Sequence, residues 1–456
     1  MSKTIQQPWL ASYPEDVPEE IELKYANLAV FLEDLFARYA ELPAFTSMGK
    51  TLSFAEIGER ARAFATYLQQ DLGMSKGARL AIMLPNIAQF PVVFYACLLS
   101  GVEVVNVNPL YTASELEQQL ADSEAHAIVV AENFSKTLGK VRKRLPHLQQ
   151  VVLTGVGDEL GGVKGLAVNW WLRYVKKAAD RKALEGAVDY KEALKRGRRL
   201  QFVAPDLALE DVAMLQYTGG TTGTPKGAML THRNLLANIA QIDVWIGQRI
   251  TEPSLVLVTA LPLYHVFCCS VNLLCFPNRA MHSLLIANPR DMRGFVKTLR
   301  RYPFAVMTVV NTLLKGLLQV PEFEKLDFSS LRFVVSGGMA LAPKVANRWQ
   351  EVTGNVIIEG YGLTETAPLL TVNLLENEHY TDGIGYPVPS TVLSLRDEAG
   401  EVVANGEAGE IWVKGPQVMK GYWRQAEENE RAFSADGWFK TGDVGVMSET
   451  GVCALG

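Results

Sequence analysis

The chain has 456 residues, which is too long for one ordinary hydrophobic core and predicts two to four domains or subdomains. Apolar residues make up 48% of it and charged residues 20%, a normal globular mixture. A net charge of −5 excludes the basic excess that is typical of nucleic-acid binders, so we expect no nucleic-acid partner.

Cysteine and histidine patterns exclude two further classes of protein. The five cysteines form no CxxC pair, and their odd number argues against the disulfide framework of a secreted domain. The six histidines show no metal-ligand spacing, so we expect no structural zinc site. The N-terminus lacks an apolar signal region, and no apolar run approaches the roughly 20 residues of a membrane span. We expect a cytoplasmic chain that is soluble or attached to the inner face of the membrane only at its surface.

The first half of the chain alternates between strand-like and helix-like segments. An amphipathic helix is predicted at 28–39, and residues 51–57 are predicted to form a strand that runs into a capped helix, with Ser53 or Thr51 near the cap. Further predicted strands are 79–84, 103–107, 127–131 and 151–154, and further predicted helices are 90–100 and 114–123. Short apolar runs separated by helices predict parallel βα units.

Residues 161–200 interrupt this alternation. They contain 11 Lys or Arg against 4 Asp or Glu, together with the adjacent Trp170 and Trp171. One interpretation is an amphipathic helix that lies on an anionic membrane with its tryptophans at the level of the headgroups. The other, which we favour at this point, is a solvated helix that packs its aromatic side chains on its own domain.

A glycine-rich stretch at 217–228 follows a predicted buried strand, 211–216, and precedes a predicted helix start at 229–236. Its glycines let the backbone bring N–H groups close to a ligand, its threonines add hydroxyl donors, and Lys226 adds a positive charge. It is not a Walker A loop, because Pro225 and Gly227 stand where that motif requires Gly and Ser or Thr. The composition predicts phosphate binding by Tyr217, Thr218, Gly219, Gly220, Thr221, Thr222, Gly223, Thr224, Pro225, Lys226, Gly227 and Ala228.

The second half of the chain changes character near residue 380. Strands are predicted at 254–260, 304–310 and 331–336, in the same βα style as before. Beyond 380, short alternating runs at 391–395, 409–414 and 437–440 are separated by Gly, Pro and Asp. This pattern predicts a small antiparallel barrel or sheet.

Residues 217–228 resemble the phosphate loop of the acyl-adenylate-forming (AMP-binding) superfamily. Five further stretches resemble motifs of that family and follow in its order: 262–267, 336–341, 359–366, 409–423 and 441–443. Residues 106–112 and 288–291 resemble bacterial long-chain fatty-acid CoA ligases in particular. The resemblance covers nearly the whole chain, and six motifs in one order make chance agreement negligible.

The resemblance implies an α/β fold of two doubly wound α/β subdomains plus a small β-barrel. We expect residues 1–55 to pack on the second α/β subdomain. Residues 56–231 would form the first α/β subdomain and end in the phosphate loop, 232–378 would form the second, and 379–456 would form the barrel. A homodimer is implied by the resemblance alone.

The resemblance also implies a set of site residues. Lys226, Thr364 and Glu365 would be catalytic, with Glu365 as the ligand of Mg²⁺. Besides the loop, the nucleotide would contact Gly337, Gly338, Glu359, Gly360, Tyr361, Gly362 and Asp443. The acyl substrate would contact His265, Phe267, Val309 and Met339, although these four could equally be core or capping residues. Taken singly, Glu365 could be a solvated helix charge and Asp443 a turn aspartate, so the ordered motifs carry these assignments.

The implied activity is that of an AMP-forming long-chain fatty-acid CoA ligase, which uses ATP, a fatty acid and coenzyme A. A medium-chain or aryl acid CoA ligase, or a non-catalytic module that binds ATP and acyl-adenylate, is the alternative. The family continues beyond 441–443 into an Asp-Arg-x-Lys hinge and a mobile C-terminal domain, whereas this sequence stops at Gly456. We therefore expect the large domain of such a ligase, with its full two-step activity impaired.

Overall fold

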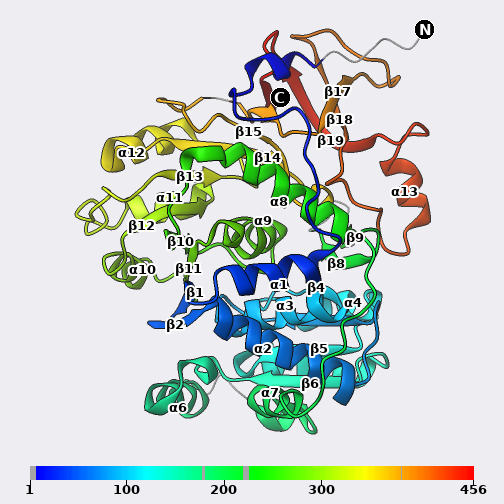
Figure 1. The fold of residues 1–456 in the computed structure, drawn as a ribbon, viewed down its shortest axis with the longest axis vertical. Helices are drawn as coiled ribbons and strands as arrows, with labels where there is room; N and C mark the ends of the chain where they lie inside the picture. Colours follow the sequence, from blue (N-terminus) through cyan, green and yellow to red (C-terminus); the bar gives the residue numbers. More distant parts are fainter. Residues whose placement is uncertain (1–6, 177–179, 219–224, 382, 456) are drawn as a thin grey trace.

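The computed structural model describes residues 7–176, 180–218, 225–381 and 383–455. Its strands form three sheets of seven, nine and four strands. In Figure 1 the two large sheets lie one above the other, and the small sheet lies at the end that carries the C-terminus. The chain therefore has two α/β subdomains and a smaller β subdomain, as the sequence predicts.

The seven-stranded sheet has the order β7-β6-β5-β3-β4-β8-β9 and is parallel from β7 to β8, while β9 is antiparallel to β8. Its central strands are buried at every position, as expected for parallel strands covered on both faces. The strands are β3 Arg79–Met83, β4 Glu103–Asn106, β5 Ala127–Ala131, β6 Gln150–Thr154, β7 Val188–Asp189, β8 Val212–Tyr217 and β9 Gly227–Thr231. The helices of this part are α2 Phe54–Thr66, α3 Gln89–Ser100, α4 Ala113–Asp122, α5 Ser135–Val141, α6 Gly162–Trp170 and α7 Tyr190–Gly197.

The nine-stranded sheet has the order β16-β15-β14-β13-β12-β10-β11-β1-β2 and is parallel from β14 to β1. Strands β1 and β2 come from the N-terminal part of the chain and extend this second sheet. The strands are β1 Pro43–Ser47, β2 Lys50–Ser53, β10 Val256–Thr259, β11 His282–Leu285, β12 Phe304–Val309, β13 Phe333–Ser336, β14 Ile357–Gly362, β15 Leu369–Val372 and β16 Tyr386–Pro387. The helices are α1 Leu28–Arg38, α8 His232–Ile246, α9 Val266–Ser270, α10 Met292–Leu299, α11 Asn311–Leu318 and α12 Pro343–Thr353.

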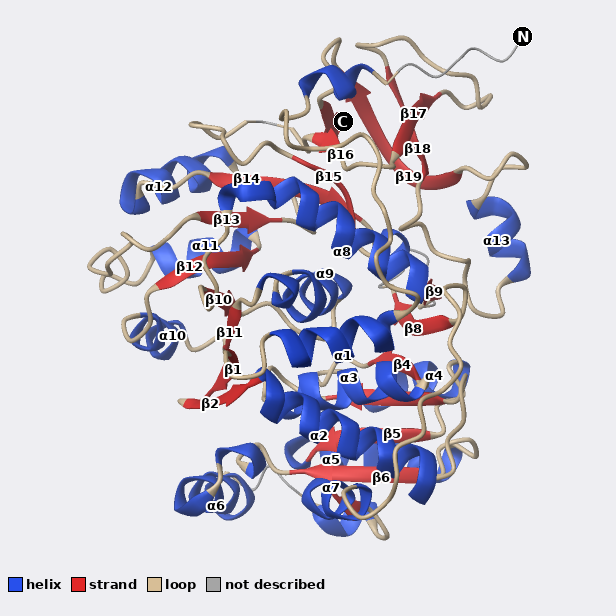
Figure 2. Cartoon of the chain, viewed as in Figure 1, coloured by secondary structure: helices blue, strands red, loops and turns tan. Residues whose placement is uncertain are grey.

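Helices fill the space between the two large sheets. Figure 2 shows α1 and α3 between their strands, and α3 is buried at all of its positions. A helix that is apolar on every side is stable only when it is surrounded by protein in this way. Ser53 caps α2, as predicted, and Glu56 completes a capping box.

The small sheet is antiparallel and has the open order β17-β18-β19-β20. Its elements are β17 Val392–Arg396, β18 Ala408–Lys414, β19 Phe439–Met447, β20 Cys453–Leu455 and the short helix α13 Ala426–Ala432. The predicted antiparallel character is confirmed, and in the described residues the barrel is an open four-stranded sheet.

The predicted helix start at 229–236 is wrong in its first three residues. Gly227–Thr231 forms β9 and pairs with β8, and α8 begins only at His232, where the Thr231 side chain accepts a hydrogen bond from Asn234 N–H. A short apolar run is compatible with a strand or a helix. Here the run pairs with β8 along the edge that β4 leaves free, and this pairing makes it a strand. The phosphate loop therefore joins the two strands of a hairpin.

His232 ties the second α/β subdomain to the N-terminal helix. Its Nδ1 accepts a hydrogen bond from the Leu28 N–H (3.1 Å), the first residue of α1. The imidazole is buried, and burial lowers its pKa from 6.5 to about 4. In the folded chain, the neutral imidazole is therefore favoured over the protonated one.

This burial predicts a pH-dependent loss of stability. The unfolded chain protonates His232 near pH 6.5 and the folded chain only near pH 4. The unfolded state therefore binds more protons between these values, and stability falls as the pH falls. His232→Asn keeps a hydrogen-bond acceptor but cannot titrate. Between pH 7 and pH 4 we expect its free energy of unfolding to fall by about 3 kcal/mol less than that of the parent. Urea unfolding across this range measures the difference, and parallel pH profiles would contradict the prediction.

Candidate active site

The β8–β9 hairpin positions the predicted phosphate loop. The Thr218 N–H donates to the Lys226 carbonyl (3.0 Å), so backbone pairing continues to the residues beside the loop. Tyr217 packs against Gly227, where a Cβ would lie 3.1 Å from the phenol ring, and its hydroxyl donates to Asp122 (2.5 Å). Pro225 precedes Lys226, and Gly227 and Ala228 belong to β9. The predicted loop residues Gly219, Gly220, Thr221, Thr222, Gly223 and Thr224 lie outside the described residues.

Lys226 meets a segment from the small β subdomain. Its ammonium forms an ion pair with Glu428 of α13 and lies 5.3 Å from the centre of the Tyr422 ring. The backbone at 421–423 runs beside β9, because Met229 N–H donates to the Gly421 carbonyl (2.9 Å) and Trp423 N–H to the Gly227 carbonyl (2.8 Å). The cation therefore has a defined place at the junction of two subdomains.

Glu365 lies close to the same junction. It belongs to the 3-10 turn Thr364–Thr366, which follows β14, and is only 9% exposed. Its Oε1 accepts a hydrogen bond from the Tyr422 hydroxyl (2.7 Å). Burial and the Glu365 charge raise the pKa of Tyr422 well above its usual range, so the phenol stays a donor. Tyr422 thus brings the predicted site residues Lys226 and Glu365 to one side chain.

The site offers one carboxylate suited to a divalent cation. Mg²⁺ is usually held by one or two carboxylates together with substrate phosphates, and Glu365 beside Lys226 fits that arrangement. Within the described ranges, no group of three or more His, Cys, Asp or Glu could hold a metal ion. The Glu365 carboxylate therefore fits a cation that arrives with a phosphate ligand.

Strands β14 and β19 bring Tyr361 and Asp443 together. The Tyr361 hydroxyl donates to Asp443 Oδ2 (2.6 Å), and burial, reinforced by that carboxylate, raises the pKa of the phenol. The Asp443 N–H donates to Thr441 Oγ1 (3.1 Å), which fixes the turn. A carboxylate can accept at two oxygens, so Asp443 can also accept from a ligand hydroxyl. Tyr361, whose ring is predicted to contact adenine, is only 8% exposed.

Glu359 holds the glycine turn that follows β13. Its carboxylate accepts from the Leu341 N–H (3.2 Å) and from the Tyr380 hydroxyl (2.7 Å). Gly338 in this turn has φ +75°, which a side chain would disfavour. At the end of β14, a Cβ on Gly362 would lie 1.9 Å from the Pro368 carbonyl oxygen. Glu359 therefore holds the turn of Gly337 and Gly338 against β14, the strand that also contains Gly360, Tyr361 and Gly362.

The four predicted acyl-contacting residues lie at or just after the ends of neighbouring strands but differ in exposure. His265 is the exposed residue before α9, and the Phe267 ring lies 3.4 Å from a Cβ built on Gly337. Val309 is fully buried and pairs with Ser336, whereas Met339 is exposed. The structure thus brings the His265, Phe267 and Gly337 segments together and places Val309 in the core.

Asn86 fixes the loop that leads to His265. Its amide nitrogen donates to the Thr259 (3.2 Å) and Leu261 (2.8 Å) carbonyls, and its oxygen accepts from the Leu263 N–H (3.0 Å). Gln216 of β8 donates to the Tyr264 carbonyl (2.9 Å) from the other side. These buried amides come from the first α/β subdomain and hold a loop of the second, so they join the two subdomains at the candidate site.

An apolar cleft of about 940 Å³ opens beyond this loop. It lies outside the carboxyl ends of parallel strands from both large sheets, where open α/β folds usually bind ligands. Its lining includes Leu110, Phe134, Val156, Leu172, Tyr264 and Ile286, and at its outer side Trp170 and Trp171. The cleft is suited to an apolar ligand.

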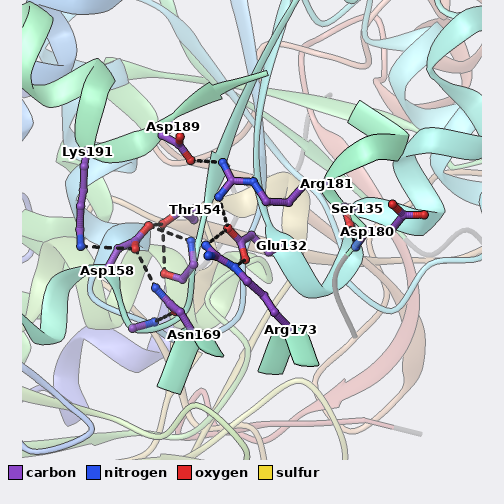
Figure 3. A network of polar contacts seen from close by, with 12 residues as sticks. Glu132, Ser135, Thr154, Asp158, Asn169, Arg173, Asp180, Arg181, Asp189 and Lys191 are labelled. Atoms are coloured by element: carbon purple, nitrogen blue, oxygen red, sulfur yellow. Dashed lines mark hydrogen bonds and ion pairs between the residues drawn. The ribbon is translucent and has the colours of Figure 1, made fainter. Parts of the chain in front are cut away.

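Residues 161–200, the basic segment, are held to the first α/β subdomain by a polar network, shown in Figure 3. Arg173 donates to the buried Glu132 through Nε (2.6 Å), and Arg181 pairs with the same carboxylate (3.0 Å). Asn169 of α6 accepts from the Gly157 N–H (2.7 Å) and donates to Asp158 (2.9 Å). Two arginines of the segment therefore point inward.

This anchoring turns the apolar side of α6 outward. Val163, Leu166 and Trp170 of α6 and Tyr174 of the helical turn Trp171–Val175 that continues it are spaced three or four residues apart and are all exposed, Trp170 at 58%. Trp171 is 45% exposed. The favoured prediction that this helix packs its aromatic side chains on its own domain is therefore wrong. The physical reason is that Gly165 and Asn169 occupy the buried face and Glu132 attracts the arginines. No helix among the described residues is long and apolar enough to cross a membrane.

Three residues that hold the candidate site together carry no predicted role. Tyr422 lies in the motif at 409–423, so its motif was the signal that could have identified it. Asn86 follows a strand end, which is a weak signal for a loop contact. Glu428 has no local signal, because its partner Lys226 is 202 residues away.

The Asn86 contacts predict a large stability effect. Asn86→Ala removes both amide donors and leaves the buried Leu263 N–H without its acceptor, so we expect a loss of about 2 to 4 kcal/mol. Thermal unfolding measures this as a midpoint several degrees lower. Asn288→Ala, at an exposed position of the same cleft, is the matched control and should leave the midpoint unchanged. Equal midpoints for both variants would contradict the role of Asn86.

Comparisons with known proteins agree with this geometry. Residues 32–423 match the model of the family described as AMP-binding enzyme. A long-chain-fatty-acid–CoA ligase of Salmonella typhimurium is 48% identical over 98% of this chain and 80% of its own length. A solved long-chain-fatty-acid–CoA ligase of Archaeoglobus fulgidus has TM-score 0.81 at 24% identity, covering 97% of this chain and 86% of that one. A solved anthranilate CoA ligase also has TM-score 0.81, at 22% identity, covering 95% of this chain and 77% of that one. The chain belongs to the AMP-binding enzyme family.

Proposed function

We propose that the chain is an AMP-forming long-chain-fatty-acid–CoA ligase. It would join a fatty acid to AMP with release of pyrophosphate, and then transfer the acyl group to coenzyme A with release of AMP. The relative from Salmonella typhimurium, 48% identical, supports the choice of acid and of thiol. The observation that carries the proposal is the meeting of Lys226, Glu365 and Tyr422 at the end of the phosphate hairpin.

The first step requires a carboxylate to attack the α-phosphate of ATP, so two anions must approach each other. Lys226 and the hairpin backbone would hold the β- and γ-phosphates, with Thr364 as a further donor. Glu365 would hold Mg²⁺, which neutralises phosphate charge when it is bound. Asp443 would accept from the ribose hydroxyls, while its hydrogen bond from Tyr361 keeps the carboxylate oriented. His265, at the exposed start of α9, would meet the carboxylate end of the acid.

A medium-chain or aryl acid ligase remains the alternative activity. The anthranilate CoA ligase shares the fold at 22% identity, a likeness that carries no information on the acid. The apolar cleft of about 940 Å³ and the exposed apolar face of α6 favour a long alkyl chain over a small aryl acid. Binding of palmitate no tighter than octanoate or benzoate would remove the long-chain assignment.

Loss of either junction charge, Lys226 or Glu365, should slow adenylation strongly. We expect Lys226→Ala and Glu365→Gln each to lower palmitate-dependent ATP–pyrophosphate exchange about 100-fold, because each removes charge stabilisation from the transition state. The exposed Lys420→Ala is the matched control and should keep the parent rate. Exchange that survives both junction substitutions would contradict the site. Nucleotide binding without exchange in the parent chain would favour the non-catalytic binding module.

We also propose that α6 places the chain on the inner face of the membrane. A row of exposed apolar side chains with two tryptophans is the composition of an interfacial helix. Lys164 and Lys176 are exposed near this row and would meet anionic headgroups. The apolar cleft reaches Trp170 and Trp171, so a lipid-borne acid at this face would lie next to it.

Membrane contact through α6 can be tested by vesicle co-sedimentation. We expect Leu166→Glu and Trp170→Glu each to reduce the bound fraction severalfold, because each places a charge in the apolar row. Val203→Glu changes an exposed apolar residue outside the segment and should bind as the parent does. A bound fraction that is the same for all three variants would leave α6 as an ordinary solvated helix.

A further inference from the structure

Helix α13 places a carboxylate on the cation that the proposed function assigns to phosphate. Lys226 and Glu428 form an ion pair, and their side chains are 22% and 28% exposed. The Lys226 ammonium lowers the pKa of the Glu428 carboxyl, so the pair is charged at neutral pH. In this state the lysine already has an anionic partner at the position from which it would contact a nucleotide.

The Lys226–Glu428 ion pair depends on two backbone segments that are held by hydrogen bonds, 421–423 and α13. The hydrogen bonds between 421–423 and β9 fix Tyr422 beside Lys226. Asn429 then fixes α13 to Tyr422, because its Oδ1 accepts from the Tyr422 N–H (2.6 Å) and its Nδ2 donates to the Tyr422 carbonyl (3.0 Å). Glu428 directly precedes Asn429, so its position relative to Lys226 follows from these bonds.

Glu428 also has a second partner to which it can turn. Arg431, one helical turn later, donates from Nη1 to Glu428 Oε1 (2.8 Å). If Lys226 leaves, the carboxylate keeps this partner and its exposure to water. Water screens a partly exposed ion pair, so it contributes little to stability. A triphosphate carries several charges and accepts charge-assisted hydrogen bonds, so it can displace such a pair.

We propose that Glu428 is the resting counterion of Lys226, and that a Mg²⁺–nucleoside triphosphate displaces it when its phosphates bind. The proposal rests on the proposed function for the identity of the ligand, but the resting pair itself is independent of it. Glu428 then sets the affinity of the site for triphosphate, since every binding event has to break the pair. It recaptures the lysine when pyrophosphate leaves.

The resting pair is tested first without nucleotide. Glu428→Gln should increase labelling of Lys226 by an amine-reactive reagent, quantified by mass spectrometry, because the carboxylate no longer covers the amine. Glu427→Gln is the matched control: Glu427 precedes Glu428 on α13, its side chain is 88% exposed, and its ion-pair partner among the described residues is Arg431. Equal labelling in the parent and Glu428→Gln would overturn the proposal.

The exchange is tested by calorimetric titration with Mg²⁺–ATP. Glu428→Gln should tighten binding roughly two- to fivefold, and Glu427→Gln should not change it. In a Lys226→Ala background, measured by competition with a fluorescent ATP analogue, the gain from Glu428→Gln should fall to less than half. Unchanged or weaker binding by Glu428→Gln, or an equal gain in both backgrounds, would overturn the proposal. If labelling changes as expected but the parent binds no ATP, the resting pair stands and the assigned nucleotide site is wrong.

Discussion

The hydrogen bonds and ring contact of Tyr422 join the two charges on which the candidate site depends. Its hydroxyl donates to Glu365, its ring lies beneath the Lys226 ammonium, and its backbone binds Asn429. These groups come from the second α/β subdomain, the phosphate hairpin and the small β subdomain. The buried Tyr422 side chain therefore holds the Glu365 carboxylate and the Lys226 ammonium near each other, although they belong to separate parts of the chain.

The wider architecture explains why such a junction can form. In both large sheets, loops follow the carboxyl ends of the parallel strands. Ligands of open α/β folds bind outside these ends. Asn86 and Gln216 of the first α/β subdomain hold the loop before His265, which belongs to the second. Because these amides are buried, their hydrogen bonds are costly to break, and the relative position of the two edges is maintained.

In the basic segment, residues 161–200, buried ion pairs shape the protein surface and not the candidate site. A buried carboxylate, Glu132, attracts Arg173 and Arg181 toward the protein, and Asn169 faces the same way. Because Asn169 lies on the buried side of α6, Leu166 and Trp170 lie on its exposed side. A basic composition thus produces an exposed apolar surface, which composition alone would not predict. An apolar patch of this kind is typical of an interaction surface.

The sequence by itself determined the features that act over a few residues. The buried run Arg79–Met83 and the Ser53 cap are local patterns, and the βα alternation with a later antiparallel part follows from them. The ordered motifs also named Lys226 and Glu365, but not what these residues contact. Only the tertiary structure decided that 227–231 is a strand, because the edge of β8 had to be available for pairing. It also decided the partners of Lys226, since Tyr422 and Glu428 lie about 200 residues away along the chain. Contacts between such distant segments depend on how whole subdomains pack, and no local pattern encodes them.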